Sequence, residues 1–200
     1  MTTFLLIRHA SHDLLGKALA GRAPGVHLNE RGKREADHLA VQLASAAIDA
    51  IYTSPRERAC ETAAPLARRL NLVPHVTSHI DEIDFGDWTG RSFIDLARDP
   101  YWPVWVEQRS RAQVPKGEAF AHVQRRVVSA IERLRDENAA RTIALFTHGD
   151  IIKAALAHYL RMSLDDLERF DVAPASVSTI VTDQAWAQVR LVNGRGDAPY

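Results

Sequence analysis

Two apolar runs that each end on a histidine constrain the fold of this 200-residue chain more than any other feature. Residues 5–10 read Leu-Leu-Ile-Arg-His-Ala, and residues 143–149 read Ile-Ala-Leu-Phe-Thr-His-Gly. Short apolar runs of this kind are typical of strands that are buried on both faces of a parallel sheet. Open α/β sheets bind ligands at the C-terminal ends of their strands, so we expect the two histidines to share one pocket.

Strands and helices alternate along most of the chain. Strands are expected at residues 4–7, 50–53, 73–76, 142–146, 177–181 and 188–192. Helices are expected after Asn29, from Ser54 to about residue 70, around 120–134, over 150–160 and after Ser163. This order predicts an α/β fold, a three-layer α/β/α sandwich around a mostly parallel central sheet.

The second helix has a strong predicted start. The stretch Ser54-Pro55-Arg56-Glu57 reads as a serine N-cap, a proline at the first helical position and a glutamate that closes a capping box. Arg58 then falls in the first turn, where the N-terminus of the helix adds its own positive potential.

Residues 79–118 differ in character from the rest of the chain. They hold three of the four tryptophans, several prolines and glycines, and only short helical patterns. Such a stretch commonly covers a site or connects core elements. Because the length fits one domain, we expect a single domain over residues 1–200, with 79–118 as a lid or insertion over the site.

The composition excludes several classes of protein. The formal net charge is zero, so no overall field favours nucleic acid or an anionic membrane. No apolar run approaches the length that spans a membrane, and the N-terminus lacks the pattern of a signal peptide. A single cysteine fits a reducing compartment, so we expect a cytoplasmic protein that binds neither nucleic acid nor membrane. No pattern specifies an oligomeric interface.

The side chains at the predicted strand ends suit a phosphoryl group. Arginine presents a planar fork to phosphoryl oxygens, and Arg8 and Arg58 are placed to do so. His148 lies beside Gly149 at the start of another helix. Positive charge nearby should lower the pKa of His9, and a neutral imidazole is a competent nucleophile towards phosphorus. His9 is therefore a candidate to form a phosphohistidine that water then hydrolyses.

The leaving alkoxide of such a reaction needs a proton donor. A carboxyl group that is kept protonated by burial or by the charge of the substrate would serve. Glu82 is the leading candidate, but spacing alone does not separate it from Asp81, Asp84 and Asp87.

Taken together, these motifs resemble the histidine phosphatase superfamily, in its phosphoglycerate-mutase-like branch, over nearly the whole chain. Arg8-His9-Ala10 looks like the Arg-His-Gly signature, residues 52–62 like the second arginine motif, residues 82–90 like the acid motif, and residues 147–149 like the second histidine motif. Residues 28–32 and 115–118 match weaker landmarks.

The resemblance implies a phosphoglycerate-mutase-like fold and a role for each matching residue. His9 would be the phosphorylated nucleophile and Glu82 the proton donor. The phosphoryl group would be bound by Arg8, Arg58, His148 and Gly149, with Arg22 as a secondary substrate contact. The resemblance also implies that no metal or other cofactor is used and that the substrate is a small phosphorylated metabolite.

Two positions depart from the pattern of this family. Ala10 stands where the family usually has a glycine. The alanine would add strain if the backbone there needs a positive φ. Leu15 stands near the place where many relatives have an asparagine that holds phosphate.

The leading hypothesis is a metal-independent phosphomonoesterase of the histidine acid phosphatase type, acting through a phosphohistidine on His9. Two alternatives are a phosphoglycerate-type mutase and a non-catalytic protein that binds a phosphorylated ligand. A mutase excludes water from its phosphoenzyme, whereas a phosphatase admits it.

Overall fold

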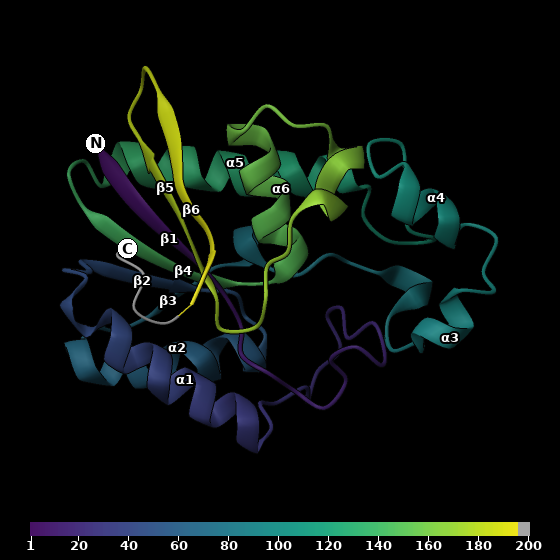
Figure 1. Ribbon diagram of the computed structural model, residues 1–200, viewed down its shortest axis with the longest axis horizontal. Coiled ribbons are helices and arrows are strands. Elements are labelled where there is room, and N and C mark those ends of the chain that lie inside the picture. The colour runs from purple at the N-terminus through teal and green to yellow at the C-terminus, as the bar shows by residue number, and fades with distance from the viewer. Residues whose placement is uncertain (196–200) are drawn as a thin grey trace.

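A six-stranded sheet forms the centre of the molecule. The computed structural model describes residues 1–195, so residues 196–200 of the expected domain lie outside the described part (Figure 1). The strands are β1 (Thr2–Arg8), β2 (Ala50–Thr53), β3 (His75–Val76), β4 (Thr142–Thr147), β5 (Val177–Thr182) and β6 (Ala187–Gly194). Their order is β3-β2-β4-β1-β5-β6; β1 to β4 pair in parallel, and β5 and β6 are added antiparallel. The predicted α/β fold with a mostly parallel sheet is confirmed.

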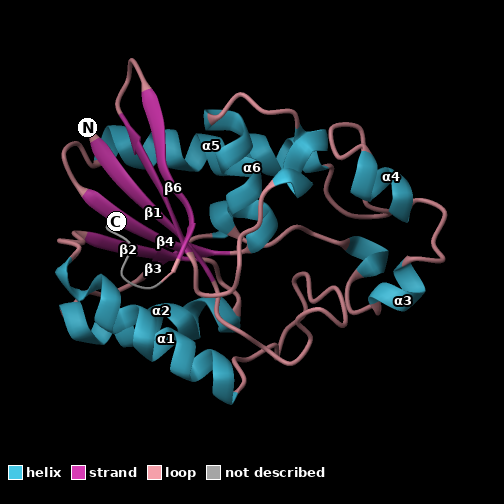
Figure 2. Ribbon diagram, viewed as in Figure 1, coloured by secondary structure: helices cyan, strands magenta, loops and turns pink. Residues whose placement is uncertain are grey.

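Helices cover both faces of this sheet and make three layers (Figure 2). The α-helices are α1 (Glu30–Gln42), α2 (Glu57–Leu70), α3 (Phe93–Leu96), α4 (Trp102–Glu107), α5 (Phe120–Glu137) and α6 (Gly149–Tyr159). Short 3₁₀ helices are η1 (Leu43–Ser45), η2 (Ser78–Ile80), η3 (Gly86–Trp88) and η4 (Leu164–Arg169). The pair α1 and α2 lies on one face, and α5 and α6 lie on the other. Within residues 1–195 no helix is both long and apolar enough to cross a membrane.

Strand β1 separates two apolar cores. Successive side chains of a strand point to opposite faces, so Phe4 and Leu6 pack with α5 and α6, while Leu5 and Ile7 pack with α1 and α2. All four side chains are almost fully buried. Burial on both faces explains why this strand reads as a continuous apolar run in the sequence.

The tryptophan-bearing segment 79–118 packs into the core on the α5 and α6 side. Trp88 and Trp105 are each only 1% exposed, and their rings lie edge to face with centroids 6.0 Å apart. Trp105 in turn meets Phe120 of α5 at 5.6 Å. These aromatic contacts join the segment to the rest of the fold. Its function as a lid stays a prediction.

Two predicted helix starts have different outcomes. Asn29 caps α1 as expected, and its side chain accepts a hydrogen bond from the Gly32 amide. The prediction that Ser54 caps α2 is wrong, because α2 begins after Arg56, which has no side-chain cap. The Ser54 oxygen accepts the Arg56 amide at 3.3 Å, and its hydroxyl hydrogen goes to Asp81. Ser54 therefore links the residues before α2 to a carboxylate that is distant in the sequence.

The C-terminal ends of β1, β2 and β4 converge as predicted. The His9 amide donates to the Thr147 carbonyl at 2.9 Å, and the Ser54 amide donates to the Phe146 carbonyl at 2.9 Å. The parallel pairing thus continues one residue past each strand. It brings the residues that follow the three strands to one edge of the sheet.

Candidate active site

A cleft of about 670 Å³ opens at this edge of the sheet. Among the residues that line it are the predicted site residues Arg8, His9, Arg58, Glu82 and Gly149. His148 lies beside them and is fully buried. The structure therefore brings together residues from four separate stretches of the chain.

His9 follows β1 and is 3% exposed. Its Nδ1 lies 2.9 Å from the carbonyl oxygen of Ala10, which is an acceptor, so Nδ1 carries the hydrogen and Nε2 keeps its lone pair. Burial, together with the charges of Arg58 and Arg8, holds the pKa of His9 well below its usual value. The ring is therefore neutral near pH 7 and has a free nucleophilic nitrogen.

Ala10 fits its position without strain. Its backbone does not have a positive φ, and its amide donates to Thr62 Oγ1 at 2.9 Å. The conformation that would have demanded glycine is not adopted here. The alanine is therefore compatible with the geometry of His9.

Arg58, in the first turn of α2, is fully buried. Its Nη2 donates to the Gly21 carbonyl at 2.8 Å, but Nε and Nη1 have no hydrogen-bond partner within residues 1–195. Arg8 donates from Nη1 to the Val172 carbonyl at 2.5 Å, and its Nε is also buried without a partner in the same part of the chain. Buried unpaired donors are costly, and guanidinium donors suit the oxygens of a phosphoryl group.

The start of α6 supports this arrangement. His148 is its N-cap, and Gly149 is its first residue. A Cβ on Gly149 would lie 3.3 Å from Arg8 Nε, so glycine leaves room for the guanidinium to cross the helix N-terminus. The N-terminus adds positive potential at the same point.

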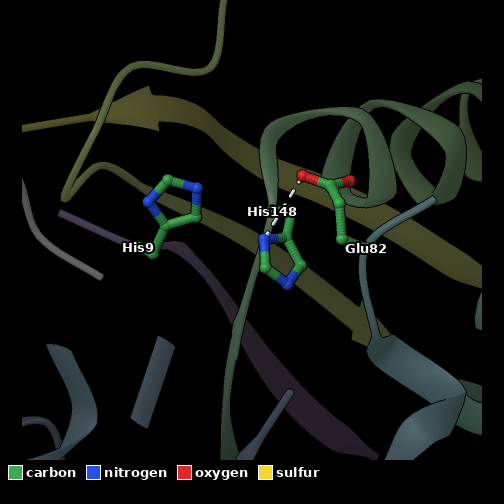
Figure 3. A group of neighbouring side chains, drawn as sticks. All are labelled: His9, Glu82 and His148. Atoms are coloured by element: carbon green, nitrogen blue, oxygen red, sulfur yellow. Dashed lines mark ion pairs between the residues drawn. The ribbon is translucent and has the colours of Figure 1, made fainter. Parts of the chain in front are cut away.

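Glu82 lies against His148 (Figure 3). Its Oε2 is 3.4 Å from His148 Nδ1 and 3.6 Å from Arg58 Nη2. Burial raises the pKa of Glu82 to about 7, Arg58 opposes the shift, and Asp150 adds to it. The carboxyl group can therefore hold a proton near neutral pH.

The other three acidic candidates lie elsewhere. The Asp84 and Asp87 side chains are 45% and 51% exposed. Asp81 is buried, but it accepts a hydrogen bond from Ser54. Of the four, Glu82 alone is among the residues that line the cleft, within the described part of the chain.

Arg22 contacts the loop that carries Glu82. Its Nε donates to the Glu82 carbonyl at 2.8 Å, and its Nη2 donates to Glu118 Oε2 at 2.8 Å. Its guanidinium also lies within ion-pair distance of Asp81. Arg22 is not among the described residues that line the cleft, so a substrate contact by this side chain stays a prediction.

Two further residues that line the cleft, His12 and Arg109, belong to none of the motifs described above. His12 is 6% exposed, lies with its ring centroid 5.1 Å from that of His9, and has its pKa lowered to about 4, chiefly by burial. Arg109 also lines the cleft, and it pairs with Asp150 at 2.9 Å and with Glu168 at 3.0 Å. Only tertiary contacts reveal these groups, because no local motif marks them.

His9, Glu82 and His148 offer ligand atoms that lie within 4.8 Å of one another, which is close enough to share a metal ion. Arg58 Nη2 lies near the same atoms, at 3.2 Å from His148 Nδ1. A cation there would face a buried guanidinium, whereas an anion would be attracted by it. The charge of the site therefore favours a phosphoryl group over a metal ion.

The chain is similar in sequence to known proteins over most of its length. The sequence model of the histidine phosphatase superfamily (branch 1) matches residues 4–194. Phosphoserine phosphatase 1 of Hydrogenobacter thermophilus is 31% identical over 186 residues, which cover 90% of this chain and 86% of that protein. The adenosylcobalamin/alpha-ribazole phosphatase of Salmonella typhimurium is 28% identical, with 95% of each chain covered.

A solved structure is similar to this chain in its fold. Bacillus stearothermophilus YhfR superposes with a TM-score of 0.92 at 25% identity, over 98% of this chain and 99% of that one. The match extends over the whole sheet and both helical layers, and it includes the segment that carries the tryptophans.

Proposed function

Because the chain belongs to the histidine phosphatase superfamily, we propose that it hydrolyses a small phosphomonoester through a phosphohistidine on His9. One observation carries this proposal. The neutral His9 ring, with a lone pair on Nε2, lies in one cleft with two arginines and with a carboxyl group whose pKa is about 7.

In the first step, Nε2 of His9 attacks phosphorus and the bond between phosphorus and the ester oxygen breaks. Arg8 and Arg58 bind the phosphoryl oxygens and stabilise the charge that develops on them. Glu82 gives its proton to the leaving alkoxide. The products are an alcohol, the phosphohistidine and an ionised Glu82.

In the second step, water attacks phosphorus and the bond to His9 Nε2 breaks. Glu82, now a carboxylate, accepts a proton from the water and returns to its starting state. Arg8 and Arg58 hold the phosphoryl group throughout. Because the guanidinium groups supply the positive charge, the reaction as proposed needs no metal ion.

The leaving group would lie against the rest of the cleft lining. That lining combines aromatic side chains with a set of charged ones, namely Phe85, Phe93, Trp102, Trp105, Arg109, Asp150, Lys153 and Glu168. Residues 79–118 supply these four phenylalanine and tryptophan side chains, and we propose that the segment acts as a lid.

Relatives are named as phosphatases of phosphoserine and of alpha-ribazole, which favours a small polar metabolite as the substrate class. The single cysteine and zero net charge fit a cytoplasmic enzyme without nucleic-acid or membrane partners.

The direct test is the substitution His9→Ala, assayed with an aryl phosphate as a generic substrate. We expect activity to fall by at least about 10³-fold, because the nucleophile is lost. His38→Ala is the matched control, since His38 is exposed on α1. Retention of full activity by His9→Ala would refute the proposal.

A further inference from the structure

A chain of buried hydrogen bonds runs behind His148. Ser54 Oγ lies 2.8 Å from His148 Nε2 and 3.0 Å from Asp81 Oδ1. Ser54 and His148 are fully buried, and Asp81 is 4% exposed. The three side chains come from the ends of β2 and β4 and from the loop after η2.

The direction of these bonds can be deduced from the donors and acceptors. Asp81 Oδ1 accepts the Glu82 amide and lies 3.0 Å from Arg56 Nε, so this oxygen is an acceptor and the Ser54 hydroxyl hydrogen points to it. The Arg56 amide donates to Ser54 Oγ at 3.3 Å. The remaining lone pair of Ser54 faces His148, so Nε2 of His148 must carry the hydrogen.

The opposite edge of the ring leads to the same assignment. Arg58 Nη2 lies 3.2 Å from His148 Nδ1, and a guanidinium can only donate. Nδ1 must therefore carry a lone pair while the ring is neutral. Burial holds the pKa of His148 well below its usual value, which agrees with a neutral ring.

We propose that Ser54 and Asp81 are positioning residues that hold His148 with its hydrogen on Nε2, so that Nδ1 presents its lone pair to Arg58. This inference rests on the proposed function only where it assigns His148 and Glu82 to the reaction. Glu82 Oε2 lies 3.4 Å from the same nitrogen, so the tautomer of His148 also sets what this carboxyl group faces.

Asp81 also fixes the acid itself. Its Oδ1 accepts the backbone amide of Glu82 at 2.8 Å, while Arg56 Nε lies 3.0 Å from the same oxygen. One carboxylate therefore orients both His148, through Ser54, and the loop that carries Glu82.

The first test reads the position of the hydrogen without turnover. Long-range ¹H–¹⁵N NMR of the imidazole nitrogens is expected to show His148 protonated at Nε2 in the unaltered protein. In Ser54→Ala the Asp81 oxygen, at 4.0 Å from Nε2, is too far to replace the hydroxyl. We expect that variant to populate the Nδ1–H form as well.

The second test uses kinetics. Ser54→Ala is expected to lower kcat by about tenfold or more, as loss of a group that orients a functional histidine does elsewhere. Ser54→Thr, which keeps a hydroxyl, should recover most of the loss. Thr179→Val is the matched control, because Thr179 is 2% exposed in β5 and its hydroxyl has no partner among the described residues.

The outcomes separate the two proposals. An Nδ1–H form of His148 in the unaltered protein would overturn the positioning role, as would a Ser54→Ala variant with unchanged NMR signals and unchanged kcat. A protein without phosphatase activity would end the proposed function. The NMR experiment would still decide the role of Ser54 and Asp81 in that case.

Discussion

Arg58 Nη2 lies 3.2 Å from His148 Nδ1, so a guanidinium and an imidazole face each other in a fully buried part of the molecule. Burial is the largest cause that lowers the pKa of each group. The protein thus maintains a desolvated positive charge beside two neutral histidines. An anion that meets this charge is bound strongly, because little water is left to compete for it.

Replacing Arg58 should therefore abolish anion binding. In Arg58→Met we expect inorganic phosphate to lose its stabilising effect, which at 100 times Kd amounts to about 2.7 kcal/mol for an intact site. Thermal unfolding with and without phosphate measures this. Arg69→Met, on the exposed side of the same helix, is the control and should keep the full effect. An equal phosphate response in both variants would contradict the assignment.

The role of Glu82 as acid predicts a dependence on the leaving group. For Glu82→Gln we expect alkyl phosphates, whose alkoxides need a proton, to be hydrolysed about 10²- to 10⁴-fold more slowly. An aryl phosphate with a good leaving group should lose far less. Asp87→Asn is the control, because Asp87 lies in the neighbouring 3₁₀ helix η3 and is exposed. Equal losses for both substrate types would exclude Glu82 as the acid.

The pKa shifts predict an asymmetric pH profile. Because burial raises the pKa of Glu82 to about 7, kcat/KM should fall as pH rises through about 7. His9, whose pKa is lowered well below 6.5, should stay neutral to more acidic pH, so the acidic limb should begin well below that value. A pH series for the unaltered protein and for Glu82→Gln tests this. The variant should lose the alkaline limb that belongs to Glu82.

The same shift has a consequence for stability. The folded state binds the Glu82 proton more tightly than the unfolded state, whose pKa is near 4.5. The contribution to the free energy of unfolding is therefore complete below about pH 4.5 and is lost as pH rises through about 7. Chemical denaturation across this range should show a smaller decline in Glu82→Gln than in the unaltered protein.

Arg109 is expected to stabilise the tryptophan-bearing segment 79–118. It is 8% exposed, pairs with Asp150 and Glu168, and lies over the Trp105 ring at 5.5 Å. Arg109→Met should lower the free energy of unfolding by roughly 1–3 kcal/mol, because Asp150 loses its partner. Arg111→Met, two residues further along and exposed, should change it little. Denaturant unfolding of both variants measures these free energies, and an equal change in the two would contradict the role of Arg109.

Much of the fold was predictable because it follows from periodic patterns. The apolar run of β1 is buried on both faces, and α5 buries apolar residues that recur at helical spacing, so both patterns can be read in the sequence. Convergence of His9, Arg58 and His148 followed from the rule that parallel strands end at one edge. The position of Glu82 did not follow, since it lies in an irregular loop that tertiary contacts hold in place.

The failures have one physical cause. Ser54 reads locally as a helix cap, but its hydroxyl bonds to Asp81 and His148, which are distant in the sequence. Arg109 belongs to no local motif, but it is buried between acidic groups of α6 and η4. Local patterns contain no information about such partners, so only the assembled structure reveals them.

Trapping of the phosphoenzyme tests the central claim most directly. The protein is mixed with a phosphomonoester, quenched in alkali, where phosphohistidine survives, and digested for mass spectrometry. The account predicts one added phosphoryl group on the peptide that contains His9, and none in His9→Ala. Turnover without a phosphorylated His9, or the same label on the His9→Ala protein, would contradict it.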